Sequence, residues 1–314
     1  MSFTTEVKEE LSRVAPTCSH CENATLAALI RIEGTLLMKG QGRYALEIAT
    51  DSPVVARFII KALHESYHLT TDLTMRRSVL HKTPNWLIEV PMQPGLNEAL
   101  LSLGVLGQEG IERGIDPDLI RKQCCVAAYL RGVFLGSGFI SNPRGDFHFE
   151  LKVETQATAD AIVELLAERS IKAKAIQRRN SYLIYIKSGA AISSFLALVG
   201  AHQSALKMEN ERVVKSVRND VNRRVNAEMA NQAKASAASV DQIMTIRYVL
   251  DHRDISSLPH ALQEYIKLRI AYPDATLKEL GEAADPPLSK SAINHRVRRL
   301  DQLAQEIARG EHRR

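Results

Sequence analysis

The sequence predicts an α+β protein in which a duplicated αββαββα domain is followed by an all-α domain with a helix-turn-helix motif. The first two thirds of the chain repeats itself at an offset of about one hundred residues, and each copy alternates helical with strand-like apolar spacing. The last third shows helical spacing and capping signals. The length of 314 residues also favours two domains, because it exceeds what one hydrophobic core usually serves.

The duplication is visible first in two helical runs that end in glycine. Residues 25–34 and 130–138 form these runs, and Gly34 and Gly138 lie 104 positions apart. Matches that follow in one order along the chain indicate a duplicated unit. They pair residues 46–48 with 149–151, 76–77 with 178–179, and 87–90 with 183–186.

The remaining elements of each copy follow from apolar periodicity. Strands are expected over 43–50 and 147–153, helices over 52–65 and 156–167, strand pairs over 70–76 with 86–90 and 171–176 with 182–187, and a short helix at the end of each copy. The duplicated domain is therefore expected to cover residues 1–205, with its copies at about 20–105 and 120–200.

This element order and the two glycine-ended helices resemble the LAGLIDADG homing endonucleases over residues 20–200. The motif at 26–34 fits that pattern well, whereas the second motif carries Arg131 where a small residue is usual. The resemblance implies that the two helices pack side by side on a pseudo-twofold axis and that the paired sheets form a saddle over DNA. Gly132 and Gly136 lie on one helical face and are expected to let the two helix backbones approach closely.

The acid that each motif of the resembled family supplies before its final glycine is present only once here. Glu33 stands at that position in the first motif and Ser137 in the second. Metal-assisted cleavage of both DNA strands needs hard oxygen ligands in both motifs. We therefore expect no catalytic residue and no metal or other cofactor, with Glu33 as a relic. The alternative is a metal-dependent endonuclease that nicks DNA with its one remaining acid.

Two basic pairs lie at equivalent strand ends, Arg76-Arg77 beside Lys82 and Arg178-Arg179 beside Lys187. Duplicated basic hairpin tips could contact phosphates of a long DNA site. Solvated charges on edge strands are at least as common. Residues 1–200 contain 22 basic and 21 acidic side chains, so no strong electrostatic footprint is expected there.

The four cysteines form two pairs, Cys18 with Cys21 and Cys124 with Cys125. The first pair has the spacing of a zinc ligand pair, but adjacent cysteines such as the second rarely complete a tetrahedral site. A disulfide is disfavoured in the cytoplasm. We expect buried or inert thiols and no metal, and the alternative is a metal or redox role.

Residues 206–238 are expected to form a helical linker. Asn219, Asn222 and Asn226 fall at i, i+3 and i+7, on one helical face beside Arg218 and Arg223. Asparagine is a poor helix former, so a partner outside the helix is expected to compensate. The small residues 233–238 are interpreted as a flexible joint.

The stretch 218–231, which contains these residues, resembles the signature of the WhiA family. That resemblance extends over essentially the whole chain. It implies an inactive LAGLIDADG domain joined to a C-terminal helix-turn-helix. It also implies a transcriptional regulator linked to cell division, chromosome segregation and, in some bacteria, sporulation.

The last domain, 239–314, begins with two expected helix starts, a capping box at 239–242 and a proline at the first helical position after Leu258. A second capping box, Thr276 with Glu279, opens a short helix that residues 283–287 break. Ser289 then opens the final helix.

Two helices with a short break, the second of them basic, are typical of a helix-turn-helix, here at about 275–308. Residues 262–287 hold three basic and five acidic side chains, whereas 288–314 hold seven and three. Ile293, Val297 and Leu300 are expected to face the preceding helices. The opposite side then carries the candidate DNA-binding residues Lys290, Ser291, Asn294, His295 and Arg298.

The formal net charge of +5 is compatible with nucleic acid, and no apolar run approaches the length of a membrane span. We expect a cytoplasmic, nucleoid-associated protein that binds double-stranded DNA at promoter sites. We do not expect it to bind a membrane. Other transcription regulators or RNA polymerase are candidate protein partners. A cell-division scaffold that makes little use of its helix-turn-helix is a further alternative to the DNA-binding regulator.

Overall fold

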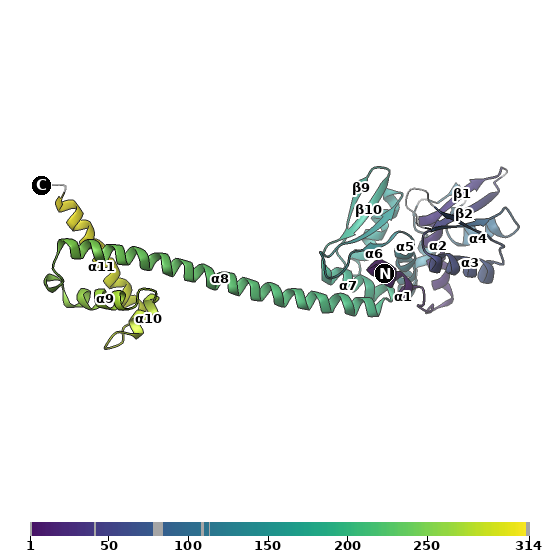
Figure 1. The fold of residues 1–314 in the computed structure, drawn as a ribbon. Coiled ribbons are helices and arrows are strands. Elements are labelled where there is room, and N and C mark those ends of the chain that lie inside the picture. Colours follow the sequence, from purple (N-terminus) through teal and green to yellow (C-terminus); the bar gives the residue numbers. More distant parts are fainter. Residues whose placement is uncertain (1, 41, 78–83, 108–109, 113, 312–314) are drawn as a thin grey trace. The chain divides into compact units, whose positions relative to one another are not determined.

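The computed structural model describes residues 2–40, 42–77, 84–107, 110–112 and 114–311. The chain separates into two compact units, Met1–Ser216 (unit 1) and Val217–Arg314 (unit 2) (Figure 1). Lys82, named above as a basic neighbour, lies outside the described residues.

Unit 1 confirms the predicted αββαββα duplication. The first copy contains α2 (Ser19–Glu33), β1 (Gly34–Met38), β2 (Tyr44–Thr50), α3 (Pro53–Tyr67), β3 (Asp72–Arg77), β4 (Pro84–Val90) and α4 (Leu96–Ser102). The second contains α5 (Gln123–Ser137), β7 (Phe139–Ile140), β8 (Phe149–Val153), α6 (Gln156–Ala167), β9 (Lys174–Arg178), β10 (Ser181–Ile186) and α7 (Gly189–Val199). Outside these copies lie α1 (Phe3–Leu11), β5 (Leu106–Gly107), β6 (Gly110–Ile111) and the 3₁₀ helix Pro117–Ile120.

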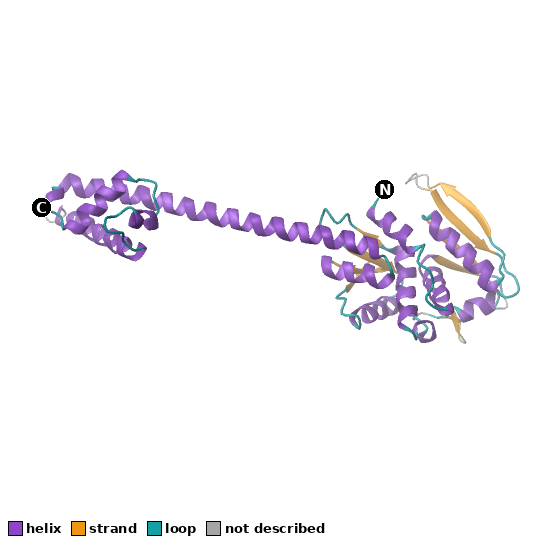
Figure 2. Cartoon of the chain, turned by 90° about the horizontal axis from the view of Figure 1, so that it is seen from below, coloured by secondary structure: helices purple, strands orange, loops and turns teal. Residues whose placement is uncertain are grey.

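Each copy folds into an antiparallel four-stranded sheet, of order β1-β2-β4-β3 in the first copy and β7-β8-β10-β9 in the second. The helices lie on one side of the sheets (Figure 2). Every second residue of a strand points to the helix side of the sheet, and many of these residues are apolar. Ile48 and Ile88 are examples, and both are fully buried. The apolar face of α3 supplies Ile59 to the same core, and α6 supplies Ile162 to the equivalent place in the second copy. The two copies share one contiguous hydrophobic core.

The two glycine-ended helices, α2 and α5, pack side by side, as the sequence predicted. A Cβ atom on Gly132 would lie 2.5 Å from the carbonyl oxygen of Thr25, and one on Gly136 would lie 2.9 Å from the Ile32 side chain. The hydroxyl of Thr25 also donates across the interface to the Ala128 carbonyl oxygen, at 3.0 Å. The expectation that these glycines allow close backbone approach is thus confirmed.

Unit 2 is helical and has its own core. The helix α8 (His202–His252) begins in unit 1 and ends in unit 2, where η2 (Ile255–Ser257), α9 (His260–Ala271), α10 (Leu277–Glu282) and α11 (Lys290–Glu311) follow. Ile246, Tyr265 and Leu280 are among its fully buried side chains. Within the residues that the structure describes, no helix is both long and apolar enough to span a membrane.

Two expectations about this region are wrong. Residues 233–238, interpreted as a flexible joint, are helical within α8, because alanine and lysine favour a helix and the stretch has no glycine or proline. Likewise no helix begins at Ser239, whose hydroxyl instead donates to the Pro273 carbonyl oxygen. Gln242 does not close a capping box either, since its side-chain oxygen accepts from Tyr265 at 2.8 Å and from Arg269 at 3.1 Å.

The closeness of α2 and α5 yields a stability prediction. Gly132→Ala should lower the free energy of unfolding by about 1–3 kcal/mol, because the added methyl group has no room between the two helices. Gly114→Ala is the control, since a Cβ at Gly114 would meet no atom of the described residues within 4 Å. Urea unfolding of the full chain measures both. Equal stability of the two variants would contradict the packing argument.

Candidate nucleic-acid interface

The helical pair α10 and α11 forms because each helix carries its own start signal. Thr276 and Glu279 make the predicted reciprocal capping box at the start of α10. The hydroxyl of Ser289 accepts from the backbone N–H of Ala292, at 3.2 Å, and so caps α11. The residues between, 283–289, contain the Pro286-Pro287 pair and keep the two helices separate.

The connection folds back tightly onto α10 at Gly281. The backbone N–H of Leu288 donates to the Gly281 carbonyl oxygen at 2.8 Å, and a Cβ at Gly281 would lie 2.2 Å from the Leu288 carbonyl oxygen. Only glycine fits a backbone approach of this kind. This contact sets the angle between α10 and α11. The sequence did not predict that angle, because the proline pair departs from the usual short turn.

The predicted inward residues of α11 are buried, with Ile293 and Leu300 at 0% and 1% exposure. Arg296 is also turned inward and pairs with Glu264 of α9 at 3.0 Å, which anchors α11 to α9. The candidate DNA-binding residues lie on the other side. Lys290, Ser291, His295 and Arg298 are exposed, and Asn294 is half-buried.

Sequence reasoning missed Arg299 as a member of this surface. It is exposed and follows His295 by four positions, which places the two side chains on one helical face. That spacing is the signal that could have identified it. At the N-terminal end of α11, the Ser291 hydroxyl lies 2.9 Å from the hydroxyl of Ser289.

The linker signature lies on α8. Arg218, Asn219, Asn222, Arg223 and Asn226 are all exposed there. Arg223 lies 3.8 Å from the carboxylate of Asp220, and Arg224 lies 2.9 Å from it. The three amide side chains therefore remain available to a partner outside the helix.

The open faces of the two sheets in unit 1 differ in charge. In the first sheet Glu47 stands opposite Glu89, and Glu89 stands opposite Asp72, so three carboxylates form a row across β2, β4 and β3. Such a row repels a phosphate backbone. In the second sheet the equivalent row holds Glu150, Tyr185 and Lys174.

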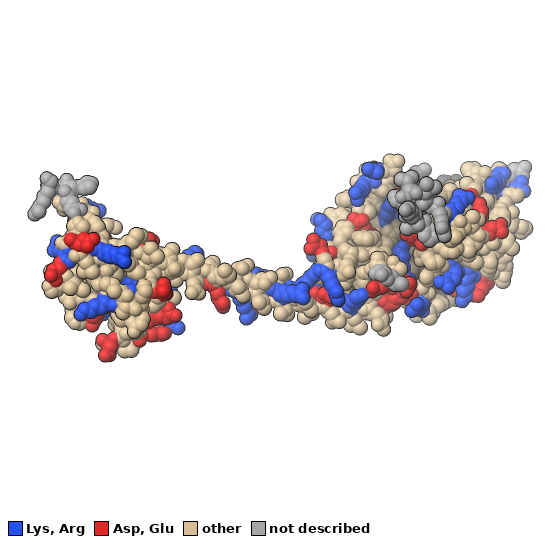
Figure 3. Space-filling model, viewed as in Figure 1, with Lys and Arg blue, Asp and Glu red and all other residues tan. Residues whose placement is uncertain are grey.

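The predicted basic hairpin tips occupy equivalent strand ends, as expected from the duplication. Arg76 and Arg178 are exposed near the ends of β3 and β9, and Arg77 ends β3. Arg179 is exposed in the turn before β10, with a left-handed φ of 54°. Lys187 lies over the ring of Tyr185, 5.6 Å from its centroid. On the face of unit 1 seen in Figure 3 the two charge signs are interspersed.

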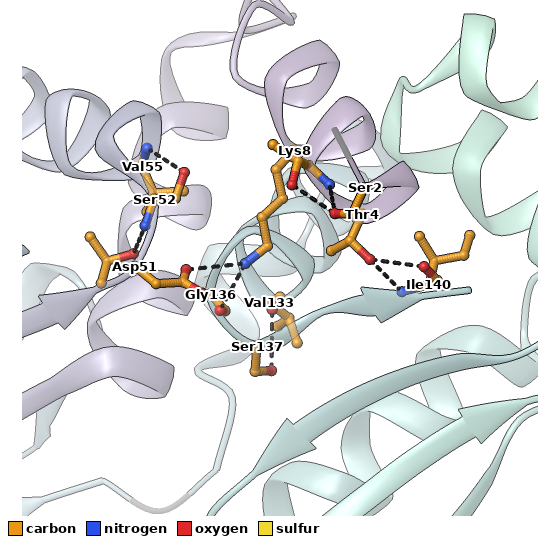
Figure 4. Close-up of polar contacts among 12 residues, drawn as sticks. Ser2, Thr4, Lys8, Asp51, Ser52, Val55, Val133, Gly136, Ser137 and Ile140 are labelled. Carbon is orange, nitrogen blue, oxygen red and sulfur yellow. Dashed lines mark hydrogen bonds and ion pairs between the residues drawn. The ribbon is translucent and has the colours of Figure 1, made fainter. Parts of the chain in front are cut away.

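The ends of α2 and α5, where the two motifs close, hold an internal cation rather than a pair of acids. Lys8, which α1 supplies, is only 9% exposed, and its ammonium lies 3.4 Å from the Gly136 carbonyl oxygen and 3.9 Å from the Asp51 carboxylate (Figure 4). Ser137 is engaged locally, since its hydroxyl donates to the Val133 carbonyl oxygen and accepts from the Lys152 backbone N–H.

Lys8 was missed by the sequence reasoning, which began the repeat at residue 20. A signal was present, because Lys8 lies beside Val7 and Leu11 on the apolar side of α1. Burial raises the pKa of Glu33 to about 8, although Lys8 and Thr50 lower it. One carboxylate oxygen of Glu33 is buried with no hydrogen-bond partner among the described residues. An ammonium held at this place disfavours a divalent cation there, because like charges repel.

The two cysteine pairs do not stay apart, contrary to the expectation that treated each pair by itself. Cys18 and Cys21 lie at the start of α2, and Cys124 and Cys125 lie at the start of α5. Because α2 and α5 pack side by side, the four sulfur atoms all lie within 4.8 Å of one another.

Comparison with known proteins matches the whole chain to one family. The model of the WhiA N-terminal LAGLIDADG-like domain matches residues 19–106, that of the WhiA LAGLIDADG-like domain matches 126–218, and that of the WhiA C-terminal HTH domain matches 221–304. The chain is similar to a probable cell division protein WhiA of Desulforamulus reducens, with 41% identity over 99% of this chain and 98% of the relative. A relative of the same name from Clostridium acetobutylicum is 36% identical over 98% of both chains.

Among solved structures, full-length WhiA from Thermatoga maritima has a similar fold, with a TM-score of 0.60 and 23% identity. The match covers 98% of this chain and 99% of that one.

The burial of Glu33 yields a pH prediction. A carboxyl whose pKa is raised on folding stabilises the protein at low pH, and this contribution is lost as pH rises toward the folded-state value of about 8. Glu33→Gln, a neutral isostere, should therefore reduce the loss of unfolding free energy between about pH 5 and pH 9 by roughly 1–3 kcal/mol. Denaturant unfolding at both pH values measures the effect.

Glu164→Gln on the exposed surface of α6 is the matched control and should leave the pH dependence unchanged. An identical pH dependence in wild type and Glu33→Gln would refute the interpretation of Glu33 as a buried neutral acid.

Proposed function

The chain belongs to the WhiA family, and from this membership we propose that it is a sequence-specific DNA-binding transcription regulator that acts in cell division and chromosome segregation. In organisms that sporulate, the same role would extend to sporulation. Its ligand would be double-stranded DNA at promoter sites, which places it at the nucleoid. Other transcription regulators and RNA polymerase are its candidate protein partners.

The observation that supports this proposal best is the polarity of α11. One side of the helix is locked to α9 and α10 by Ile293, Leu300 and the Arg296–Glu264 pair. The other side presents a lysine, an arginine and hydrogen-bonding side chains to solvent. A helix held in this way can enter the major groove as a rigid body.

The position of each side chain along α11 suggests its role. Residues at the start of a recognition helix lie deepest in the groove, so Ser291, Asn294 and His295 are the proposed base readers. An asparagine can pair with adenine through two hydrogen bonds. Lys290, Arg298 and Arg299 carry the positive charge that phosphates attract.

In unit 1, we assign any DNA contact to the second copy. Lys174 and Arg178 lie on its edge strand β9 and Arg179 in the turn after it, whereas the first sheet presents the carboxylate row of Glu47, Glu89 and Asp72. Arg76, exposed near the end of β3, would then contact phosphates only at the margin of that first sheet, and Arg77 stays a candidate phosphate contact. The exposed linker residues Asn219 and Asn222 are further candidates for a contact with DNA or a protein partner.

We further propose that the protein is not an enzyme. Only the first motif supplies an acid, the buried Glu33, because the second supplies the locally bonded Ser137. The other carboxylate nearby, Asp51, is paired with the ammonium of Lys8. The nickase with one remaining acid and the cell-division scaffold are the two rival functions.

The DNA-reading proposal is tested on α11. Genome-wide footprinting of the full chain first supplies bound sites. In titrations at fixed salt, Asn294→Ala should reduce the preference among sites by about 1–3 kcal/mol. Arg298→Ala should weaken all sites alike and lower the salt slope by about one.

Arg309→Ala is the matched control, an exposed arginine near the C-terminal end of the same helix. The base-reading role fails if Asn294→Ala leaves both affinity and site preference unchanged. Absence of any bound site in vivo would favour the scaffold instead.

The non-enzyme proposal is tested with supercoiled plasmid incubated with Mg²⁺ or Mn²⁺, which should remain supercoiled. Nicking that appears in the wild type and disappears in Glu33→Gln would establish the nickase and overturn the proposal.

A further inference from the structure

The four thiols at the start of α2 and α5 form a compact cluster. The sulfur of Cys18 lies 3.4 Å from that of Cys21, 3.6 Å from that of Cys125 and 3.7 Å from that of Cys124. All four sulfur atoms lie within 4.8 Å of one another. Cys21 and Cys125 are each 2% exposed, whereas Cys18 and Cys124 are half-buried and face the protein surface.

The spacing fits one tetrahedral ion. A zinc–sulfur bond of about 2.3 Å implies edges of about 3.8 Å in a regular tetrahedron of four thiolates. The three measured distances from Cys18 are 3.4, 3.6 and 3.7 Å, close to that edge. Four soft thiolates in this geometry select Zn²⁺ or a single iron ion over hard cations such as Mg²⁺.

We propose that Cys18, Cys21, Cys124 and Cys125 form a structural site for a single Zn²⁺ ion. The site lies at the helix starts, at the opposite ends of α2 and α5 from Glu33 and Ser137. It differs from the metal sites of a nuclease in place, ligand type and role. A metal bound there ties the two copies together, with two ligands from each.

The duplication explains how adjacent cysteines can complete such a site. Neither pair supplies a tetrahedron alone, but Cys21 and Cys125 occupy equivalent positions of the two copies. Packing α2 against α5 brings these positions together, and one more thiol comes from the start of each helix, Cys18 at the N-cap of α2 and Cys124 in the first turn of α5. The positive end of each helix dipole also favours the thiolate form that a metal needs.

Two other occupants of this cluster are less consistent with the geometry. An iron–sulfur cluster places several metal and sulfide atoms between its cysteines, and sulfurs all within 4.8 Å of one another leave no room for them. Disulfides require sulfur atoms about 2.0 Å apart, and the four cysteines are free thiols.

The test uses the full chain, expressed with zinc in the medium and purified under reducing conditions without chelator. Elemental analysis should find about one zinc per chain. Exchange into Co²⁺ should give the thiolate charge-transfer absorption and the visible bands of tetrahedral cobalt. Removal of the metal by a chelator should lower the midpoint of thermal unfolding.

Cys18→Ser and Cys124→Ser change the two half-buried ligands, so the core stays filled. Loss of a residue that only hydrogen-bonds to a metal ligand typically reduces metal affinity by roughly 10- to 100-fold. Because each of these variants removes a ligand itself, each should reduce metal affinity by more than that. His20→Ala is the matched control, because His20 lies between Cys18 and Cys21 but is exposed. This variant should retain its zinc.

If a serine variant fails to fold, binding of Co²⁺ to the metal-depleted wild type decides, and saturation at one ion per chain supports the site. The proposal is overturned if the folded wild type contains no metal, gives no cobalt–thiolate band and has four reactive thiols. Loss of thiols in pairs without metal overturns it too, in favour of disulfides. Iron in place of zinc refutes the assignment of the ion. None of these outcomes depends on DNA binding.

Discussion

The close packing of α2 against α5 is the constraint on which the rest of unit 1 depends. Gly132 and Gly136 leave room for the other helix backbone, and the bond from Thr25 to Ala128 crosses the same interface. Each sheet follows directly from the end of one of these helices, so their spacing sets where both sheets stand. The same packing brings together the two motif ends and, at the opposite ends, the four thiols.

Between the ends of the two motifs lies the buried ammonium of Lys8, next to the Asp51 carboxylate. The Lys8 ammonium lies 3.9 Å from the Asp51 carboxylate, and burial raises the pKa of Glu33 although Lys8 lowers it. This arrangement couples α1 to both motifs, because Lys8 contacts Gly136 at the end of α5 and Asp51 after β2. The first helix of the chain therefore links the two copies near the ends of their motifs.

In unit 2 the candidate interface depends on backbone geometry as much as on charge. Gly281 allows the chain to fold back before α11, and Arg296 fixes that helix to α9 through Glu264. Of the arginines close together on α11, Arg296 is therefore structural, whereas Arg298 and Arg299 are exposed. Charge counting alone cannot make this distinction.

The sequence by itself determined the duplication, the element order and the inward face of α11, because these depend on periodicity, glycine positions and capping residues that act locally. The continuation of α8 through residues 233–238 also follows from local helix propensity, which the interpretation as a flexible joint overlooked. Tertiary structure alone decided two things. It placed Lys8 against Gly136, and it joined Cys18 and Cys21 to Cys124 and Cys125. Both are contacts between residues more than a hundred positions apart, which local patterns do not encode.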